Sequence, residues 1–180
     1  MDFFTRDTGV ITVGVTGFAK SKKRRQEIDY FRLLSLTAEQ RGGKWRLKDV
    51  STQRVFTGFS ESYSAMETGY QMLREASKII PKGVPEAPLF DLFIAVFEQV
   101  NAENIAAWNA YLLANMLDFL GIFHAEDLQQ NTTINTKQQK IITFAVATSV
   151  DDFMQHIHRI TPEDTQKIQQ YCERQVGLMR

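Results

Sequence analysis

Apolar and polar residues alternate in the first half of the chain, which is the two-residue period of half-buried β-strands. Three such runs cover residues 10–16, 30–36 and 44–50. Gly42 and Gly43 predict a tight turn before the third run, because glycine adopts positive φ without steric cost. Consecutive strands with no helix between them predict an antiparallel sheet or a small barrel.

The second half of the chain changes to the helical period. We expect Ser60 to cap a first helix that Pro81 ends, with Tyr63, Met66, Tyr70 and Leu73 on its apolar side. Further helices are predicted over 88–100 and 104–120 and from Thr161 onward, with Phe119 on the inner stripe of the second of these and Gly121 closing it. Residues 129–139 are polar and predict a loop, whereas 141–150 are β-rich but ambiguous. The fold class is therefore α+β.

The charges divide the chain at about the same place as the periodicity. Residues 1–60 carry twelve Lys or Arg against six Asp or Glu, a formal charge of +6, and residues 61–180 carry −6, so the total is zero. We expect a basic β domain over 1–56 and an acidic α-helical domain over 57–180. A basic half indicates a polyanionic partner, although small domains also vary in charge by several units.

Composition narrows the class of protein further. Cys172 is the single cysteine, so an internal disulfide framework is excluded and a reducing compartment is expected. The start of the chain has no pattern of a secretory signal, and no apolar run is long enough to cross a bilayer. These features predict a soluble cytoplasmic protein.

Few residues are candidates for catalysis or metal binding. His156 and His158 lie near Asp151 and Asp152, but a His-x-His pair shares one face only in a strand, and this segment is predicted to be helical or irregular. Cys172 falls on the apolar stripe of its helix, which indicates a core thiol rather than a nucleophile. His124 is isolated, and no phosphate-binding loop or nucleophile elbow is present. We expect no catalysis, no cofactor and no bound metal.

The basic residues of the first half are more specific. One group lies in a predicted loop between strands, and another repeats at every second position of a strand whose opposite face carries Trp45 and Leu47. A basic loop beside a cationic strand face is suited to follow a phosphate backbone. An edge strand protected by lysines against aggregation would explain Lys44 and Lys48 but not the loop. The predicted DNA-binding residues are Lys20, Lys22, Lys23, Arg24, Arg25, Arg41, Lys44, Arg46 and Lys48. Phe18, Tyr30 and Phe31 are aromatic candidates for base stacking, but core packing is the favoured role for each.

Several segments resemble the RecO family of bacterial DNA-repair mediators. Phe4-Thr5-Arg6-Asp7-Thr8-Gly9, followed by Gly17-Phe18-Ala19-Lys20-Ser21-Lys22, is similar to the start of the family's barrel. Residues 33–36 and 43–50 resemble its next two strands, and Leu117 to Phe123 resembles the end of its helical domain. The resemblance covers most of residues 3–123 and lies in the order of elements more than in an invariant motif.

The resemblance implies an oligonucleotide-binding (OB) fold, an antiparallel β-barrel, ahead of an α-helical domain. It implies binding of single- and double-stranded DNA, annealing of complementary strands, and loading of RecA onto SSB-coated DNA together with RecR, in the cytoplasm at the nucleoid. Family members begin with a further strand and a half before Phe4, so the barrel is expected to lack its first strand and to show an unpaired edge that recruits another chain. The zinc-binding cysteines of some members are absent, and Asn104 to Ala107 replace the basic residues that dock the SSB C-terminal tail in others.

Two other functions remain open at this point. An OB-type module that binds RNA or assists assembly would use the same groove. An enzyme that uses His156 and His158 is a third and weaker possibility.

Overall fold

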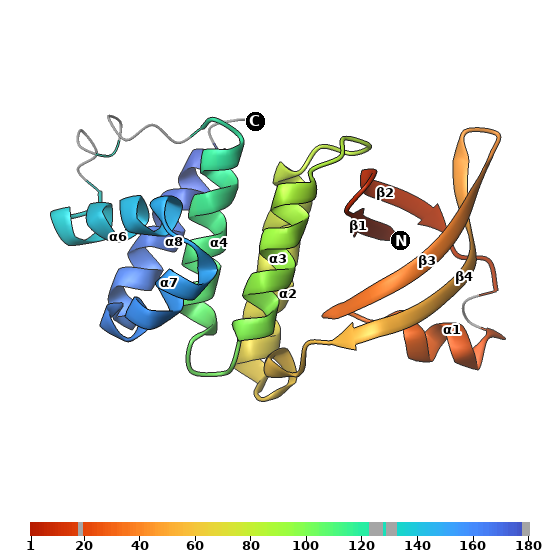
Figure 1. The fold of residues 1–180 in the computed structure, drawn as a ribbon, viewed down its shortest axis with the longest axis horizontal. Coiled ribbons are helices and arrows are strands. Elements are labelled where there is room, and N and C mark those ends of the chain that lie inside the picture. Colours follow the sequence, from red (N-terminus) through yellow and green to blue (C-terminus); the bar gives the residue numbers. More distant parts are fainter. Residues whose placement is uncertain (18–19, 123–127, 129–132, 178–180) are drawn as a thin grey trace.

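The computed structural model of the 180-residue chain describes residues 1–17, 20–122, 128 and 133–177. The side chains of Lys23, Arg24, Val176 and Gly177 also lie outside the described part. The fold is α+β, as predicted, with the sheet and one short helix on one side of the molecule and the other helices on the opposite side (Figure 1). The strands are β1 (Asp2–Thr5), β2 (Gly9–Gly14), β3 (Arg32–Arg41) and β4 (Lys44–Val55). The α-helices are α1 (Lys22–Glu27), α2 (Tyr63–Ile79), α3 (Ala87–Gln99), α4 (Ile105–Phe119), α6 (Thr136–Ala147), α7 (Val150–His156) and α8 (Pro162–Gly177).

The sheet is open and mixed, which corrects the prediction of purely antiparallel pairing, and the described strands do not close into a barrel. Its strand order is β1-β2-β4-β3, and β2 pairs with β4 in the parallel direction through Val13 and Gly14. The β1–β2 and β3–β4 pairs are antiparallel. The sequence missed the parallel pair because α1 and β3 intervene between its two strands. β1 and β3 are the outer strands of the described sheet, so the expected unpaired edge is confirmed.

The β3–β4 hairpin is the longest element of the sheet. Gly42 and Gly43 form its turn with φ of 55° and 73°, as predicted. The strands are longer than the alternation indicated because pairing continues to Arg32 and Val55. A register shift at Thr37 adds one residue to β4 near Lys48, which interrupts its alternation.

The helices follow their predicted order, with local corrections. Ser62, not Ser60, caps α2, and its hydroxyl accepts a hydrogen bond from Ala65 N at 3.0 Å. Tyr63 and Tyr70 are wrongly predicted as core residues, since they are 75% and 40% exposed. Phe119 is likewise exposed at the end of α4. Gly121 closes α4 at φ 65°, as predicted.

Two C-terminal segments show how caps define helices. Residues 136–147 form α6, which corrects both the loop predicted to 139 and the ambiguous β-rich run after it. Asn135 and Gln138 build a capping box at its start, and the helix then buries Ile142 and Ala145. α8 begins at Pro162 behind Thr161, as the sequence predicts.

The larger core lies among the helices and reaches the sheet. Trp108 is fully buried and packs against Tyr111 and Phe153. On the sheet side, Phe31 stacks on Phe59 with ring centroids 4.2 Å apart, although Phe31 has a φ of 55°. Gly69 of α2 permits this contact, because a Cβ there would lie 2.4 Å from the Phe59 ring. The strands are therefore joined to α2 through aromatic packing.

A smaller core lies on the inner face of the sheet, around Val13, Leu47 and Val50. Half-buried side chains of neighbouring strands surround it, among them Phe3 and Trp45. Within the parts of the chain that the structure describes, no helix is both long and apolar enough to cross a membrane.

Candidate nucleic-acid interface

The β3–β4 turn gathers one group of the predicted cations. Arg41 and Lys44 are cross-strand partners beside the turn. Lys44 and Arg46 are exposed, whereas Trp45 and Leu47 turn toward the inner face, as the alternation predicts. Successive side chains of a strand point to opposite faces, so burial of Trp45 and Leu47 in the small core places Lys44 and Arg46 on the solvent side of β4.

Glu39 is an acidic member of this group that the sequence analysis missed. It lies opposite Arg46 in the strand register. Its carboxylate pairs with Lys48 at 2.9 Å and with Arg41 at 2.7 Å. The hydrogen bond from Lys48, then the charges of Arg41, Lys48 and Arg46, lower the pKa of Glu39. The group therefore contains one anion among four cations and stays net positive.

Lys82 brings a further cation to the same region from the helical half. The α2–α3 connection lies along β2, with a parallel bridge between Val10 and Lys82. Lys82 pairs with Asp2 at 2.9 Å and donates to the Thr12 hydroxyl at 3.2 Å. Together with Lys44 and Arg46 it lines an open cavity of about 820 Å³ beside β2 and β4. No local pattern links residue 82 to residue 44, so the sequence could not reveal this arrangement.

The second group of cations lies on α1, not in a loop as predicted. α1 is a six-residue helix, and its exposed side chains include Lys22 and Arg25. Lys20 is exposed just before it, whereas the side chains of Lys23 and Arg24 lie outside the described part. Glu27 fixes the end of the helix to β4, since its carboxylate accepts from Thr52 N at 2.6 Å. Glu27 and Thr52 are 25 residues apart in sequence, so the run of like charges alone did not predict a helix.

The two groups do not form one groove. α1 contacts β4 at Thr52, six residues beyond Arg46, and a strand advances about 3.3 Å per residue. In Figure 1, α1 lies below the strands, whereas the β3–β4 turn lies at the top of the hairpin. The predicted site is therefore two separate basic surfaces. We call Arg41, Lys44, Arg46, Lys48 and Lys82 the strand surface.

The aromatic candidates fall into different environments. Tyr30 is 60% exposed, which contradicts the expected core role, and its ring meets that of Tyr70 edge-on at 4.8 Å. Phe31 packs in the core on Phe59, as expected. Phe18 lies outside the described residues.

The remaining candidates for chemistry are isolated from one another. Burial raises the pKa of the Cys172 thiol to about 12. The His156 ring bonds its own helix, with Nδ1 3.0 Å from the Asp152 carbonyl, and His158 is exposed in the 3-10 turn that follows. Among the described residues, no three His, Cys, Asp or Glu side chains are grouped so that they could hold a metal ion. His124 lies outside those residues.

No family model matches the chain, and no curated protein matches it.

Proposed function

We propose that this chain binds the phosphate backbone of nucleic acid through the strand surface, and that it acts as a RecO-type DNA-repair mediator. The observation that carries the proposal is the cavity shared by Lys44, Arg46 and Lys82. Three cations from two distant parts of the sequence line one open depression, and Gly43 on its wall has open space where a side chain would lie, so a ligand can approach the backbone there. Such a depression is suited to an extended polyanion.

The electrostatics of the strand surface favour a phosphate ligand. Lys44 has no ion-pair partner among the described residues, and Arg46 meets Glu39 only at longer range. Lys82 forms an ion pair with Asp2, which partly neutralises its charge. Phosphate contacts from such side chains release counterions, and affinity then falls as salt rises.

The RecO form of the proposal rests on the order of elements and on the resemblance. An open four-stranded sheet with two unpaired outer strands is what an OB barrel without its first strand would leave, and helices follow it along the chain. In this role the chain would anneal complementary DNA strands and help RecR load RecA on SSB-coated DNA. The OB barrel itself and the RecR contact are parts of the proposal.

Binding to single-stranded DNA, duplex DNA and RNA, measured in parallel over a range of salt, tests the proposal. We expect Lys44→Ala and Arg46→Ala each to reduce the slope of log affinity against log salt by about 0.7–0.9. Lys140→Ala, an exposed lysine of α6, is the matched control and should leave the slope unchanged. Equal effects of all three substitutions, or none, would exclude the strand surface.

A second measurement separates the RecO role from the alternative of an RNA-binding module. We expect the protein to accelerate annealing of complementary DNA strands, including strands coated with SSB, and to require Lys44 and Arg46 for it. Tight RNA binding without annealing of DNA would favour the RNA-binding module instead.

A further inference from the structure

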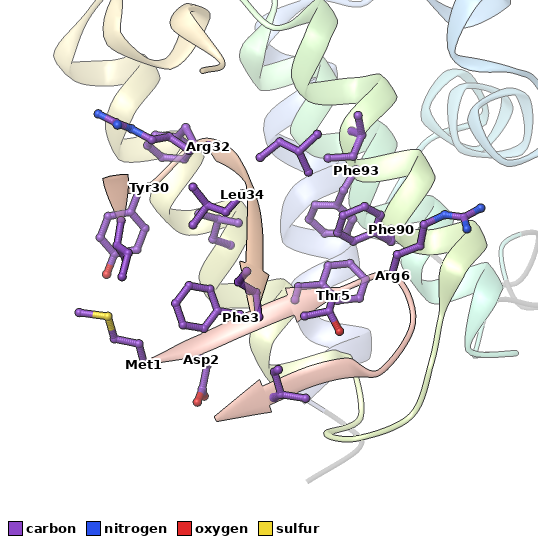
Figure 2. A pocket seen from close by; sticks show the side chains of 18 of the residues that line it. Met1, Asp2, Phe3, Thr5, Arg6, Tyr30, Arg32, Leu34, Phe90 and Phe93 are labelled. Atoms are coloured by element: carbon purple, nitrogen blue, oxygen red, sulfur yellow. The ribbon is translucent and has the colours of Figure 1, made fainter. Parts of the chain in front are cut away.

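Two exposed tyrosine rings lie side by side where the sheet meets the helices. Tyr30 precedes β3 and Tyr70 belongs to α2, and their ring planes meet at 88° with centroids 4.8 Å apart. Figure 2 shows Tyr30 at one end of a pocket, with Phe90 and Phe93 at the other end and the Arg32 guanidinium pointing outward. Neither ring belongs to the strand surface, so the pair has no role in the binding described above.

Aromatic side chains of the core hold this pair from behind. The Phe31 ring lies 5.2 Å from that of Tyr70 and 6.3 Å from that of Tyr30, and it stacks on Phe59. Among the described residues, Phe31 is the only one other than glycine with a positive φ. Such a conformation is strained, and it persists where the surroundings hold it, often at functional sites. Here it accompanies one ring packed in the core and the preceding ring left at the surface.

Polar contacts join the tyrosine pair to the cationic helix α1. The Arg32 guanidinium donates to the Gln26 carbonyl of α1 at 2.5 Å and pairs with Asp29 at 3.4 Å. The Asp29 carboxylate in turn accepts from Tyr30 N at 2.8 Å. Glu27, the last residue of α1, is three positions before Tyr30, so their Cα atoms are at most about 11 Å apart. The helix and the ring therefore belong to one local unit.

The cations of α1 are available to an anion beside the rings. Lys22 and Arg25 are exposed, and neither forms an ion pair with another residue that the structure describes. The acidic residues that follow them have structural contacts, since Glu27 accepts from Thr52 N and Asp29 holds Arg32. Exposed aromatic faces next to such cations match a single-stranded nucleotide, which carries a phosphate and an uncovered base.

We propose that Tyr30 and Tyr70 form a stacking platform for one unpaired base of a single-stranded nucleic acid, while Lys22 and Arg25 contact the neighbouring phosphates. The two rings form a corner, so a base that stacks on one ring meets the other edge-on, and both arrangements are favourable for aromatic pairs. In a duplex the base faces are covered by their neighbours, so this site selects single strands over duplex.

This site is separate from the strand surface and shares with the proposed function only the class of ligand. None of its four residues lines the cavity of Lys44, Arg46 and Lys82. The strand surface contacts phosphates and does not distinguish paired from unpaired bases, whereas the tyrosine platform does. A protein partner fits this surface less well, because charged residues are depleted at the centres of protein interfaces.

Affinity for a thymidine strand of about fifteen nucleotides, compared with an abasic strand of the same length, tests the platform. Both carry the same phosphates, so we expect the bases to raise affinity at least about fivefold, the lower limit for base–aromatic stacking. Tyr30→Leu and Tyr70→Leu keep an apolar side chain without a ring and should each remove most of this preference. Tyr30→Phe keeps the ring and should retain it. Tyr63→Leu, at an exposed tyrosine earlier on α2, is the matched control and should also retain it.

Salt dependence separates this site from the strand surface. Tyr30→Leu should leave the slope of log affinity against log salt unchanged, because stacking displaces no counterions, whereas Arg25→Ala should reduce it by about 0.7 on single strands. If Lys44→Ala has no effect but the thymidine preference still requires Tyr30, only the strand surface is excluded.

The remaining outcomes decide the ligand. A uridine strand that is preferred over the abasic one extends the ligand to RNA, and preference for thymidine alone restricts it to DNA. Equal affinity of the unsubstituted protein for thymidine and abasic strands would overturn the proposal and leave the tyrosine pair to a protein partner. A preference that survives both Tyr30→Leu and Tyr70→Leu, or that Tyr63→Leu removes equally, would overturn it as well.

Discussion

Glu39 Oε1 lies 2.9 Å from Lys48 Nζ across the β3–β4 pair, on the face that carries the strand cations. The same oxygen is 2.7 Å from Arg41 Nε, so one carboxylate holds two of the predicted DNA-binding side chains. Because these cations lower the pKa of Glu39, the carboxylate is ionised at neutral pH. It therefore competes with a phosphate for Arg41 and Lys48.

The first prediction is that Glu39→Gln strengthens nucleic-acid binding. The substitution removes the negative charge that competes with a phosphate at this surface, so we expect affinity at low salt to rise about two- to fivefold. The salt slope should also steepen, by about 0.7–0.9 for each new phosphate contact. Fluorescence anisotropy with a labelled single strand measures both quantities.

Glu103→Gln removes an equal charge from an exposed position between α3 and α4 and should change neither quantity beyond a small uniform effect. If the two substitutions have the same effect, only the net charge of the protein matters. In that case the strand surface is not the place where nucleic acid binds.

The sequence predicted correctly those turns, strand faces and helix starts that neighbouring residues determine. Gly42 and Gly43 fixed the hairpin turn, and the alternation around Trp45 and Leu47 placed Lys44 and Arg46 on the exposed face. Thr161 and Pro162 likewise predicted the start of α8 correctly. Each of these signals acts within a few residues along the chain.

The missed features depend on contacts between distant residues. α1 forms from a run of cations because Glu27 is held by Thr52 of β4. The parallel pairing of β2 with β4 and the position of Lys82 beside β2 likewise join segments that are far apart in sequence. The position of Lys82 needs the helical half to lie against the sheet, so no pattern within the first 60 residues could predict the composition of the strand surface.

The second prediction concerns acid stability through Asp164 at the start of α8. The carboxylate is buried and bonds Lys137 of α6, the Thr161 hydroxyl at 2.7 Å and the Thr161 backbone N–H at 3.2 Å. Burial alone would raise its pKa, but these hydrogen bonds, led by that of Lys137, lower the pKa from 3.8 to about 2. The carboxylate thus stabilises the fold above about pH 4, and this contribution is lost as pH falls through about 2.

Asp164→Asn should lower the free energy of unfolding by about 2 kcal/mol at neutral pH, which corresponds to the shift in pKa. The difference from the unsubstituted protein should shrink between pH 4 and 2. Urea unfolding at several pH values measures it, and Asp118→Asn, at an exposed aspartate near the end of α4, is the control. A difference that stays constant down to pH 2 would contradict the assigned role of the charge.

The third prediction is that Cys172 is unreactive in the folded protein. The thiol is fully buried and its pKa is raised to about 12, so very little thiolate is present at neutral pH. Iodoacetamide should modify one thiol per chain in concentrated urea and almost none in native buffer. Rapid native alkylation would show that α8 opens frequently.

The last prediction compares two asparagines of α4. Asn109 is 1% exposed, and neither its amide nitrogen nor its amide oxygen has a hydrogen-bond partner among the described residues. The Asn115 amide nitrogen instead donates to the Tyr111 carbonyl at 2.9 Å and to the Ala145 carbonyl at 3.2 Å, which joins α4 to α6. A buried polar group without partners costs about 1–3 kcal/mol, whereas a formed hydrogen bond contributes about 1 kcal/mol.

Asn109→Ala should therefore leave the free energy of unfolding unchanged or raise it by up to about 1 kcal/mol, because relief of the unpaired amide offsets the small cavity left behind. Asn115→Ala should lower it by about 1 kcal/mol, because two carbonyl contacts are lost. Both substitutions gain the same helix propensity, so their difference isolates the hydrogen bonds. Urea unfolding of the two variants measures this difference directly. If Asn109→Ala is the more destabilising of the two, the prediction is wrong. The Asn109 amide then has a hydrogen-bond partner in solution, such as a buried water molecule.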